Sequence, residues 1–106
     1  MGTPKYERGR KREQHSKYRS KLVDKLPKRL GLDPEKSVSL DAGIWSINYK
    51  DQLLIRFEAT GGRNVEILAC KSGRALTWPS RMKMMRDPEG VIEMTLRRLT
   101  REEREG

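Results

Sequence analysis

The chain has 106 residues, of which 34% are hydrophobic and 37% are charged. A chain of this length forms one domain at most, and so low a hydrophobic fraction predicts a small core. Its 24 Lys and Arg residues outnumber its 15 Asp and Glu residues, which gives a formal net charge of +9. Such an excess of positive charge favours a polyanionic partner.

The residue types that several classes of site require are scarce in this chain. The single cysteine, Cys70, and the single histidine, His15, are too few for an internal disulfide, a zinc site, a haem or an iron-sulfur cluster. The sequence has no phosphate-binding glycine loop, and no nucleophile has a neighbouring base to activate it. We therefore expect a protein that is not an enzyme, with no cofactor, no catalytic residue and no metal ligand.

The longest uncharged stretch covers residues 42–49. A membrane-spanning helix needs about 20 consecutive apolar residues, and a signal peptide needs an apolar run near the N-terminus, where this chain is most charged. We expect a protein that is not secreted and has no membrane contact. Its expected location is the cytoplasm, or the nucleus if the source is eukaryotic.

Positive charge is concentrated in the first 31 residues, which hold 11 basic and 3 acidic residues and carry a net charge of +8. The rest of the chain carries a net charge of only +1. We therefore divide the chain into a basic N-terminal arm over residues 1–31 and a small α+β domain over residues 32–106. Residues 1–12 have too few apolar side chains to form a core, so this part of the arm is expected to be disordered.

The second half of the arm has a helical pattern. Tyr18, Leu22 and Leu26 recur at a spacing of four residues, which predicts a helix over residues 13–30. A proline inside a helix removes a hydrogen bond and clashes with the preceding turn, so we expect Pro27 to end or kink this helix near Leu26.

Alternation of apolar and polar residues over residues 43–70 predicts three strands in an antiparallel meander. Three-residue loops at residues 50–52 and 60–62 bring the apolar positions of neighbouring strands opposite one another, with Gly62 in the left-handed conformation. The expected pairs are Trp45 with Phe57, Ile47 with Ile55, Tyr49 with Leu53, Leu53 with Ala69, Ile55 with Ile67, Phe57 with Val65 and Ala59 with Arg63. On the opposite face, Ile44, Leu54 and Leu68 are either a homodimer contact or scattered exposed residues.

The C-terminal third predicts a short extended piece over residues 75–78, a brief helix from Pro79 to Arg86, and a longer helix to about Arg104. Asp87 is the expected N-cap of the longer helix, with Pro88 at its first position. The methionines of these helices either fill the core or form an adaptable partner-binding surface; they are Met82, Met84, Met85 and Met94. The expected fold is therefore α+β, with a three-stranded antiparallel meander between an N-terminal and a C-terminal helix (α-β-β-β-α).

Two segments, Tyr49–Glu58 and Lys71–Met85, resemble the single-stranded-DNA-binding domain of the positive-cofactor-four transcriptional coactivator family. The resemblance covers about 40 residues and is a likeness of fold. It implies a basic N-terminal arm ahead of a twisted sheet and a helix. It also nominates Lys50, Arg56, Lys71 and Arg74 as phosphate contacts.

These observations predict a nucleic-acid-binding protein, of DNA or RNA, whose basic arm contacts phosphates. The expected arm contacts are Arg8, Arg10, Lys11, Arg12, Lys17, Arg19 and Lys21. The expected secondary contacts are Arg56, Arg63, Lys71 and Arg74. An alternative is a small protein, such as a virus-encoded inhibitor, that docks on a large nucleoprotein complex such as a polymerase, a ribosome or a CRISPR-type nuclease.

Overall fold

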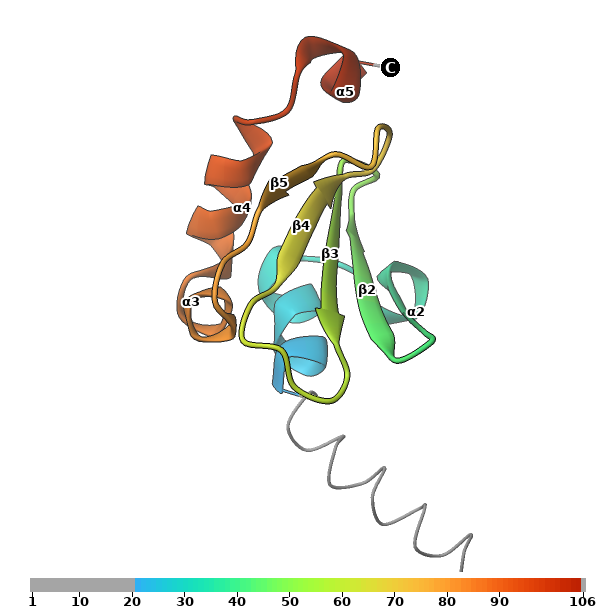
Figure 1. The fold of residues 1–106 in the computed structure, drawn as a ribbon, viewed down its shortest axis with the longest axis vertical. Helices are drawn as coiled ribbons and strands as arrows, with labels where there is room; N and C mark the ends of the chain where they lie inside the picture. Colours follow the sequence, from blue (N-terminus) through green and yellow to red (C-terminus); the bar gives the residue numbers. More distant parts are fainter. Residues whose placement is uncertain (1–20, 106) are drawn as a thin grey trace, which may run out of the picture.

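Five antiparallel strands form the centre of the structure, a computed structural model that describes residues 21–105. Each strand pairs with the next one along the chain, so the sheet is a simple meander in the order β1-β2-β3-β4-β5 (Figure 1). The strands are β1 (Val38–Asp41), β2 (Ile44–Tyr49), β3 (Leu53–Glu58), β4 (Glu66–Ala69) and β5 (Ala75–Thr77). Together with the helices this is an α+β fold, as the sequence predicts.

The prediction of only three strands is wrong, because β1 and β5 extend the sheet at both edges. β1 is only four residues long and three of them are exposed, so its alternation gives little hydrophobic signal. It joins β2 through Ala42 and Gly43, whose φ angles of 51° and 76° form a two-residue turn without the usual Asn-Gly pair. β5 is three residues long and pairs with β4 across a bulge.

The hairpin of β2 and β3 has the predicted register. Trp45 lies opposite Phe57, Ile47 opposite Ile55, and Tyr49 opposite Leu53. Asp51 in the three-residue loop has a left-handed φ of 58°, and its N–H donates to the side-chain oxygen of Asn48 over 2.8 Å. The loop is therefore closed by side-chain chemistry that strand periodicity does not reveal.

The hairpin of β3 and β4 follows the prediction only in the half that is farther from its loop. Leu53 pairs with Ala69 and Ile55 with Ile67, but the ladder ends at Arg56 and Glu66. The expected pairs of Phe57 with Val65 and of Ala59 with Arg63 do not form part of it. The left-handed glycine of this loop is Gly61, with φ 138°, and not Gly62.

The reason for this shorter ladder is a competing partner for the chain before β4. The N–H of Val65 donates to the carbonyl oxygen of Pro79 over 2.7 Å, and Asn64 forms an isolated antiparallel bridge with Ser80. Residues 63–65 therefore turn away from β3 and pair with the segment that leads into α3 (Arg81–Arg86).

Residues 21–30 are helical through Pro27, so the predicted end of the helix near Leu26 is wrong. Leu26 and Pro27 are both buried, and Gly31, with φ 72°, ends the helical segment. The N–H of Leu32 donates to the carbonyl oxygen of Pro27 over 2.7 Å, and that of Gly31 to Lys28 over 3.3 Å. Burial and this cap outweigh the hydrogen bond that proline removes. The rest of the predicted arm, residues 1–20, lies outside the described residues.

The C-terminal region forms two helices where one is predicted. Asp87 caps α4 (Pro88–Leu96) as expected, and its carboxylate accepts from the N–H of Gly90 over 3.1 Å. The chain then bends and begins α5 (Arg101–Glu105). Thr100 and Glu103 bond reciprocally, side chain to backbone, at 2.8 and 3.2 Å, which is a capping box that starts a new helix.

The preceding helix, α3, begins after its N-cap Ser80 and not at Pro79. A one-turn helix, α2 (Pro34–Ser37), precedes β1.

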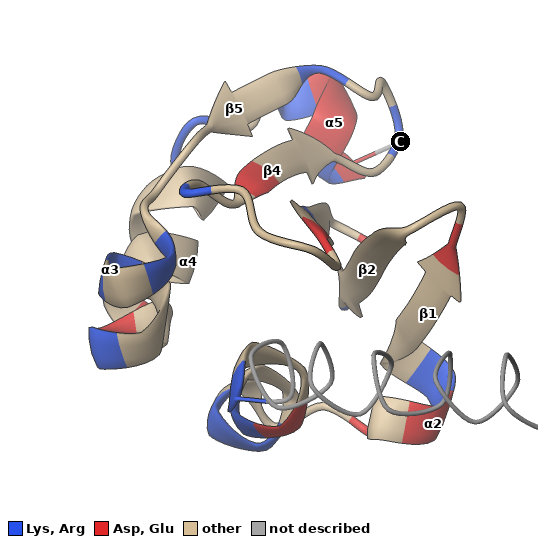
Figure 2. Ribbon diagram, turned by 60° about the horizontal axis from the view of Figure 1, so that its bottom comes forward, with Lys and Arg blue, Asp and Glu red and all other residues tan. Residues whose placement is uncertain are grey.

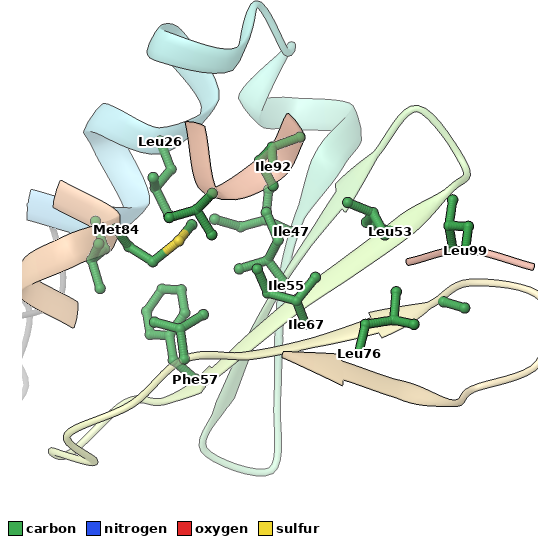
Figure 3. Close-up of a cluster of buried hydrophobic side chains, with 14 residues drawn as sticks. Leu26, Ile47, Leu53, Ile55, Phe57, Ile67, Leu76, Met84, Ile92 and Leu99 are labelled. Atoms are coloured by element: carbon green, nitrogen blue, oxygen red, sulfur yellow. The ribbon is translucent and has the colours of Figure 1, made fainter. Parts of the chain in front are cut away.

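The core lies between one face of the sheet and the helices. Figure 3 shows Leu26, Met84 and Ile92 pointing from helices toward side chains of the central strands, such as Ile47 and Ile55. Of the four methionines in α3 and α4, Met84 fills the core and Met85 packs against it, whereas Met82 and Met94 are exposed. No helix within residues 21–105 is long and apolar enough to cross a membrane.

Candidate nucleic-acid interface

Only part of the predicted interface falls within the described residues. Lys21 is exposed on the helical segment 21–30. Six predicted contacts lie outside the described residues: Arg8, Arg10, Lys11, Arg12, Lys17 and Arg19. The remaining predicted contacts are spread over both ends and one face of the sheet.

Lys71 and Arg74 lie in the turn between β4 and β5, next to α5 (Figure 1). Arg74 contacts the Glu103 carboxylate through both Nε and Nη2, at 3.3 and 2.7 Å, and Nη2 also donates to the carbonyl oxygen of Arg98 over 2.9 Å. Glu103 is only 6% exposed and also accepts from the hydroxyl of Ser72. The charge of Arg74 is therefore neutralised by a bond that fastens α5 to the sheet.

The hydrogen bonds to Glu103 lower its pKa from the usual value to about 2, with Arg74 the largest cause and Ser72 the next. The carboxylate is consequently charged at every pH at which the protein would normally be handled. This end of the molecule holds Lys71 as a cation without an ion pair among residues 21–105, but it also holds the acidic residues of α5.

Arg56 lies on the face of the sheet that no helix of residues 21–105 covers. It is opposite Glu66 in the ladder, and the nearest charged atoms of the two side chains are 3.7 Å apart. The predicted apolar patch on this face is divided: Leu54 and Leu68 pair directly across β3 and β4, whereas Ile44 lies opposite Glu58 at the far end of the strands.

Arg63 lies at the other end of the sheet, in the loop between β3 and β4. Its carbonyl oxygen accepts from the N–H of Arg81 over 3.0 Å, at the start of α3. The side chain of Arg63 is exposed and forms no ion pair with any residue of the described part of the chain. The loop therefore presents a free cation beside α3.

α3 carries three basic residues and no acidic residue in its six positions, Arg81–Arg86. Lys83 and Arg86 are exposed, and neither forms an ion pair within residues 21–105. Neither was predicted as a contact. A basic run in so short a helix gives no indication of which cations the fold will bring together.

Arg81, the first residue of α3, has a different role. Its guanidinium lies 5.3 Å from the centre of the Phe57 ring and donates to the carbonyl oxygen of Glu58 over 2.5 Å. Burial lowers the pKa of Arg81, although a guanidinium remains charged at neutral pH. This residue anchors α3 to the end of β3.

Two exposed apolar side chains lie in the same region. Trp78 follows β5 directly and is 56% exposed, and Met82 on α3 is 69% exposed. A large exposed aromatic residue beside free cations is typical of surfaces that bind unpaired bases.

The helical segment 21–30 adds further cations to this end of the molecule. It carries Lys21, Lys25 and Lys28, and its Arg29 bonds to Glu89 at the start of α4 over 2.7 Å. Figure 1 shows this segment, α3 and the loop between β3 and β4 at the lower end of the sheet, opposite α5. In Figure 2, Lys and Arg mark both α3 and the helical segment, whereas α5 carries both signs of charge. We call Arg63, Lys83, Arg86 and these three lysines the basic end.

Within residues 21–105 no three His, Cys, Asp or Glu side chains are grouped so that they could hold a metal ion. Comparisons of the chain with protein-family models, with curated proteins and with solved structures give no match.

Proposed function

We propose that this protein binds nucleic acid without catalysing a reaction on it, and that phosphates lie along the basic end. The observation that carries the proposal is the grouping of Arg63, Lys83 and Arg86 at one end of the body, without ion pairs among residues 21–105. The strongly basic residues 1–20, which hold seven basic and two acidic residues, extend the same charge along the sequence.

Unpaired cations support phosphate binding more strongly than total charge does. An Arg or Lys that already holds a carboxylate has to give up that bond before it binds a phosphate, whereas an exposed free cation only releases counterions from the nucleic acid. Arg74 belongs to the first kind, because Glu103 holds it in two hydrogen bonds. Lys83 and Arg86 belong to the second kind.

The shape of the basic end also suits an extended polyanion. α3 and the loop that holds Arg63 are connected through backbone hydrogen bonds at Val65 and Arg81. The backbone positions of the cations on these two elements therefore keep a fixed spacing, so little backbone entropy is lost when they bind a phosphate backbone.

The test is equilibrium binding of the full chain to a labelled oligonucleotide over a series of salt concentrations. Roughly 6 to 10 phosphate contacts predict a loss of affinity of about 10³- to 10⁵-fold between about 50 and 200 mM salt. An affinity that does not change with salt would remove the proposal. Recovery of a protein partner from lysate after complete nuclease digestion would instead support docking on a larger complex.

A further inference from the structure

We infer that the protein binds single-stranded nucleic acid and that one unpaired base stacks on Trp78, over a hollow in the open face of the sheet. This inference rests on the proposed function and adds to it the form of nucleic acid and the place where a base binds. It is carried by the exposure of Trp78, by the lining of the hollow, and by the position of both beside the basic end.

The backbone on either side of Trp78 is held in place. Thr77, the preceding residue, pairs with Ile67 in the sheet, and Ser80, two residues later, bridges to Asn64. The side chain between these two fixed points is nevertheless 56% exposed. An aromatic side chain on a fixed backbone is a ready stacking platform, because little freedom is lost when a base covers it.

The hollow beside Trp78 has a volume of about 260 Å³, which lies just below the usual range of about 300–1,000 Å³ for small-molecule sites. A volume of this size suits a single flat ring system. Ile44 provides apolar lining, and the Asn64 side chain provides an amide donor and acceptor.

The charges around the hollow favour different positions for a base and for its phosphate. Glu58 and Glu66 line the hollow together with Arg56, which lies 3.7 Å from Glu66. The two carboxylates outnumber this one cation, so the lining has a net negative charge that disfavours a phosphate inside it. Arg63, by contrast, is the residue between Gly62 and Asn64, both of which line the hollow. We therefore place the phosphate of such a nucleotide toward Arg63, the residue of the basic end that adjoins this lining in the sequence.

This arrangement requires an unpaired base. In a duplex the faces of each base are covered by its neighbours, so an exposed indole cannot stack on them unless the base is first turned out of the helix, at a cost of a few kcal/mol. Single strands offer base faces without that cost, and stacking tolerates any sequence because every base has a π-face.

The experiment uses the fluorescence of Trp78 in a Trp45→Phe variant, in which Trp78 is the only tryptophan. The probe is one short mixed-sequence oligonucleotide, as DNA and as RNA, single-stranded or annealed to its complement. We expect the single-stranded oligonucleotide, as DNA or as RNA or as both, to quench the fluorescence of Trp78. The duplexes should leave this fluorescence nearly unchanged. In the wild-type background, Trp78→Ala should weaken single-strand binding by about 5- to 150-fold.

Two variants serve as matched controls. Trp78→Phe keeps an aromatic ring and should retain most of the affinity, whereas Met82→Ala removes another exposed apolar side chain from the same region and should leave the affinity unchanged. The inference is overturned if Trp78→Ala binds single strands as tightly as the wild type, or if duplexes quench Trp78 as strongly as single strands do. If no oligonucleotide binds even at low salt, the proposed function itself fails.

Discussion

The N–H of Arg81 donates to the carbonyl oxygen of Arg63 over 3.0 Å, and this bond joins two segments that are 18 positions apart in the sequence. It lies beside the bridge of Asn64 with Ser80, so the loop after β3 and the start of α3 behave as one unit. The exposed side chain of Arg63 is thereby placed next to α3, whose Lys83 and Arg86 form no ion pair within residues 21–105. Neither segment alone has the charge that the two have together.

Arg81 should matter for stability and Lys83 should not. Arg81→Ala removes both the contact with the Phe57 ring and the hydrogen bond to Glu58. We expect it to lower the free energy of unfolding by about 1–3 kcal/mol, whereas Lys83→Ala changes it by less than about 0.5 kcal/mol. Urea unfolding measures both values. Equal effects of the two substitutions would contradict the anchoring role of Arg81.

Gly90 is expected to be required by the N-cap of α4. A Cβ atom at this position would lie 2.2 Å from a carboxylate oxygen of Asp87, whose other oxygen accepts from the Gly90 N–H. Gly90→Ala should therefore destabilise the protein by about 1 kcal/mol, although alanine favours helices. In an Asp87→Ala background the same change should stabilise by about 0.5–1 kcal/mol. Chemical unfolding of the wild type and the three variants measures this coupling, and the same sign in both backgrounds would refute it.

The bond between Arg74 and Glu103 predicts a loss of stability in acid. The pKa of Glu103 is lowered to about 2 in the folded protein, while an unfolded Glu has a pKa of about 4.3. The stabilisation from the charged carboxylate is therefore complete above about pH 4.3 and is lost as the pH falls toward 2. We expect Glu103→Gln to have a lower melting temperature than the wild type at pH 7 and a similar one near pH 2. Glu102→Gln, which changes an exposed neighbour, should match the wild type throughout.

Truncation should separate binding from folding. Removal of residues 1–20 takes away a net charge of +5, and we expect the shortened protein to fold but to bind nucleic acid at least about tenfold more weakly at low salt. Removal of residues 1–31 also takes away Leu22 and Leu26, which are 2% and 1% exposed in the core. Losing such a side chain costs about 2–5 kcal/mol, so this protein should not unfold cooperatively. Thermal unfolding and binding titrations distinguish the two outcomes, and full affinity after removal of residues 1–20 would contradict the first.

The β2–β3 hairpin could be predicted because two independent signals agreed. Alternation fixed the buried face, and a three-residue loop allowed only one register that kept Ile47 opposite Ile55. β1 gave neither signal, because its side chains are mostly exposed and its turn uses Ala42 at a left-handed φ. The end of the β3–β4 ladder could not be predicted either, because it depends on the hydrogen bond that the N–H of Val65 donates to the carbonyl oxygen of Pro79.

The candidate interface was predictable only in its charge. Arg63 was nominated from the sequence, but Lys83, Arg86 and Trp78 were not, because their proximity depends on the contact between the β3–β4 loop and α3. Arg74 shows the opposite effect: the sequence counts it as a free cation, whereas the fold pairs it with Glu103, 29 positions away. Charge composition alone therefore does not distinguish cations that bind a ligand from cations that hold the fold together.

The location of the phosphate contacts is tested most directly by the salt dependence of binding in two double variants. Lys83→Gln with Arg86→Gln removes two charges from the basic end, and Lys50→Gln with Lys71→Gln removes two from the turns at the opposite end of the sheet. Both variants have the same net charge. The slope of log affinity against log salt is negative. We predict that the first variant reduces the magnitude of this slope by about 1.4–1.8 and that the second leaves it unchanged. Equal slopes for the two variants would contradict the assignment of phosphate binding to the basic end.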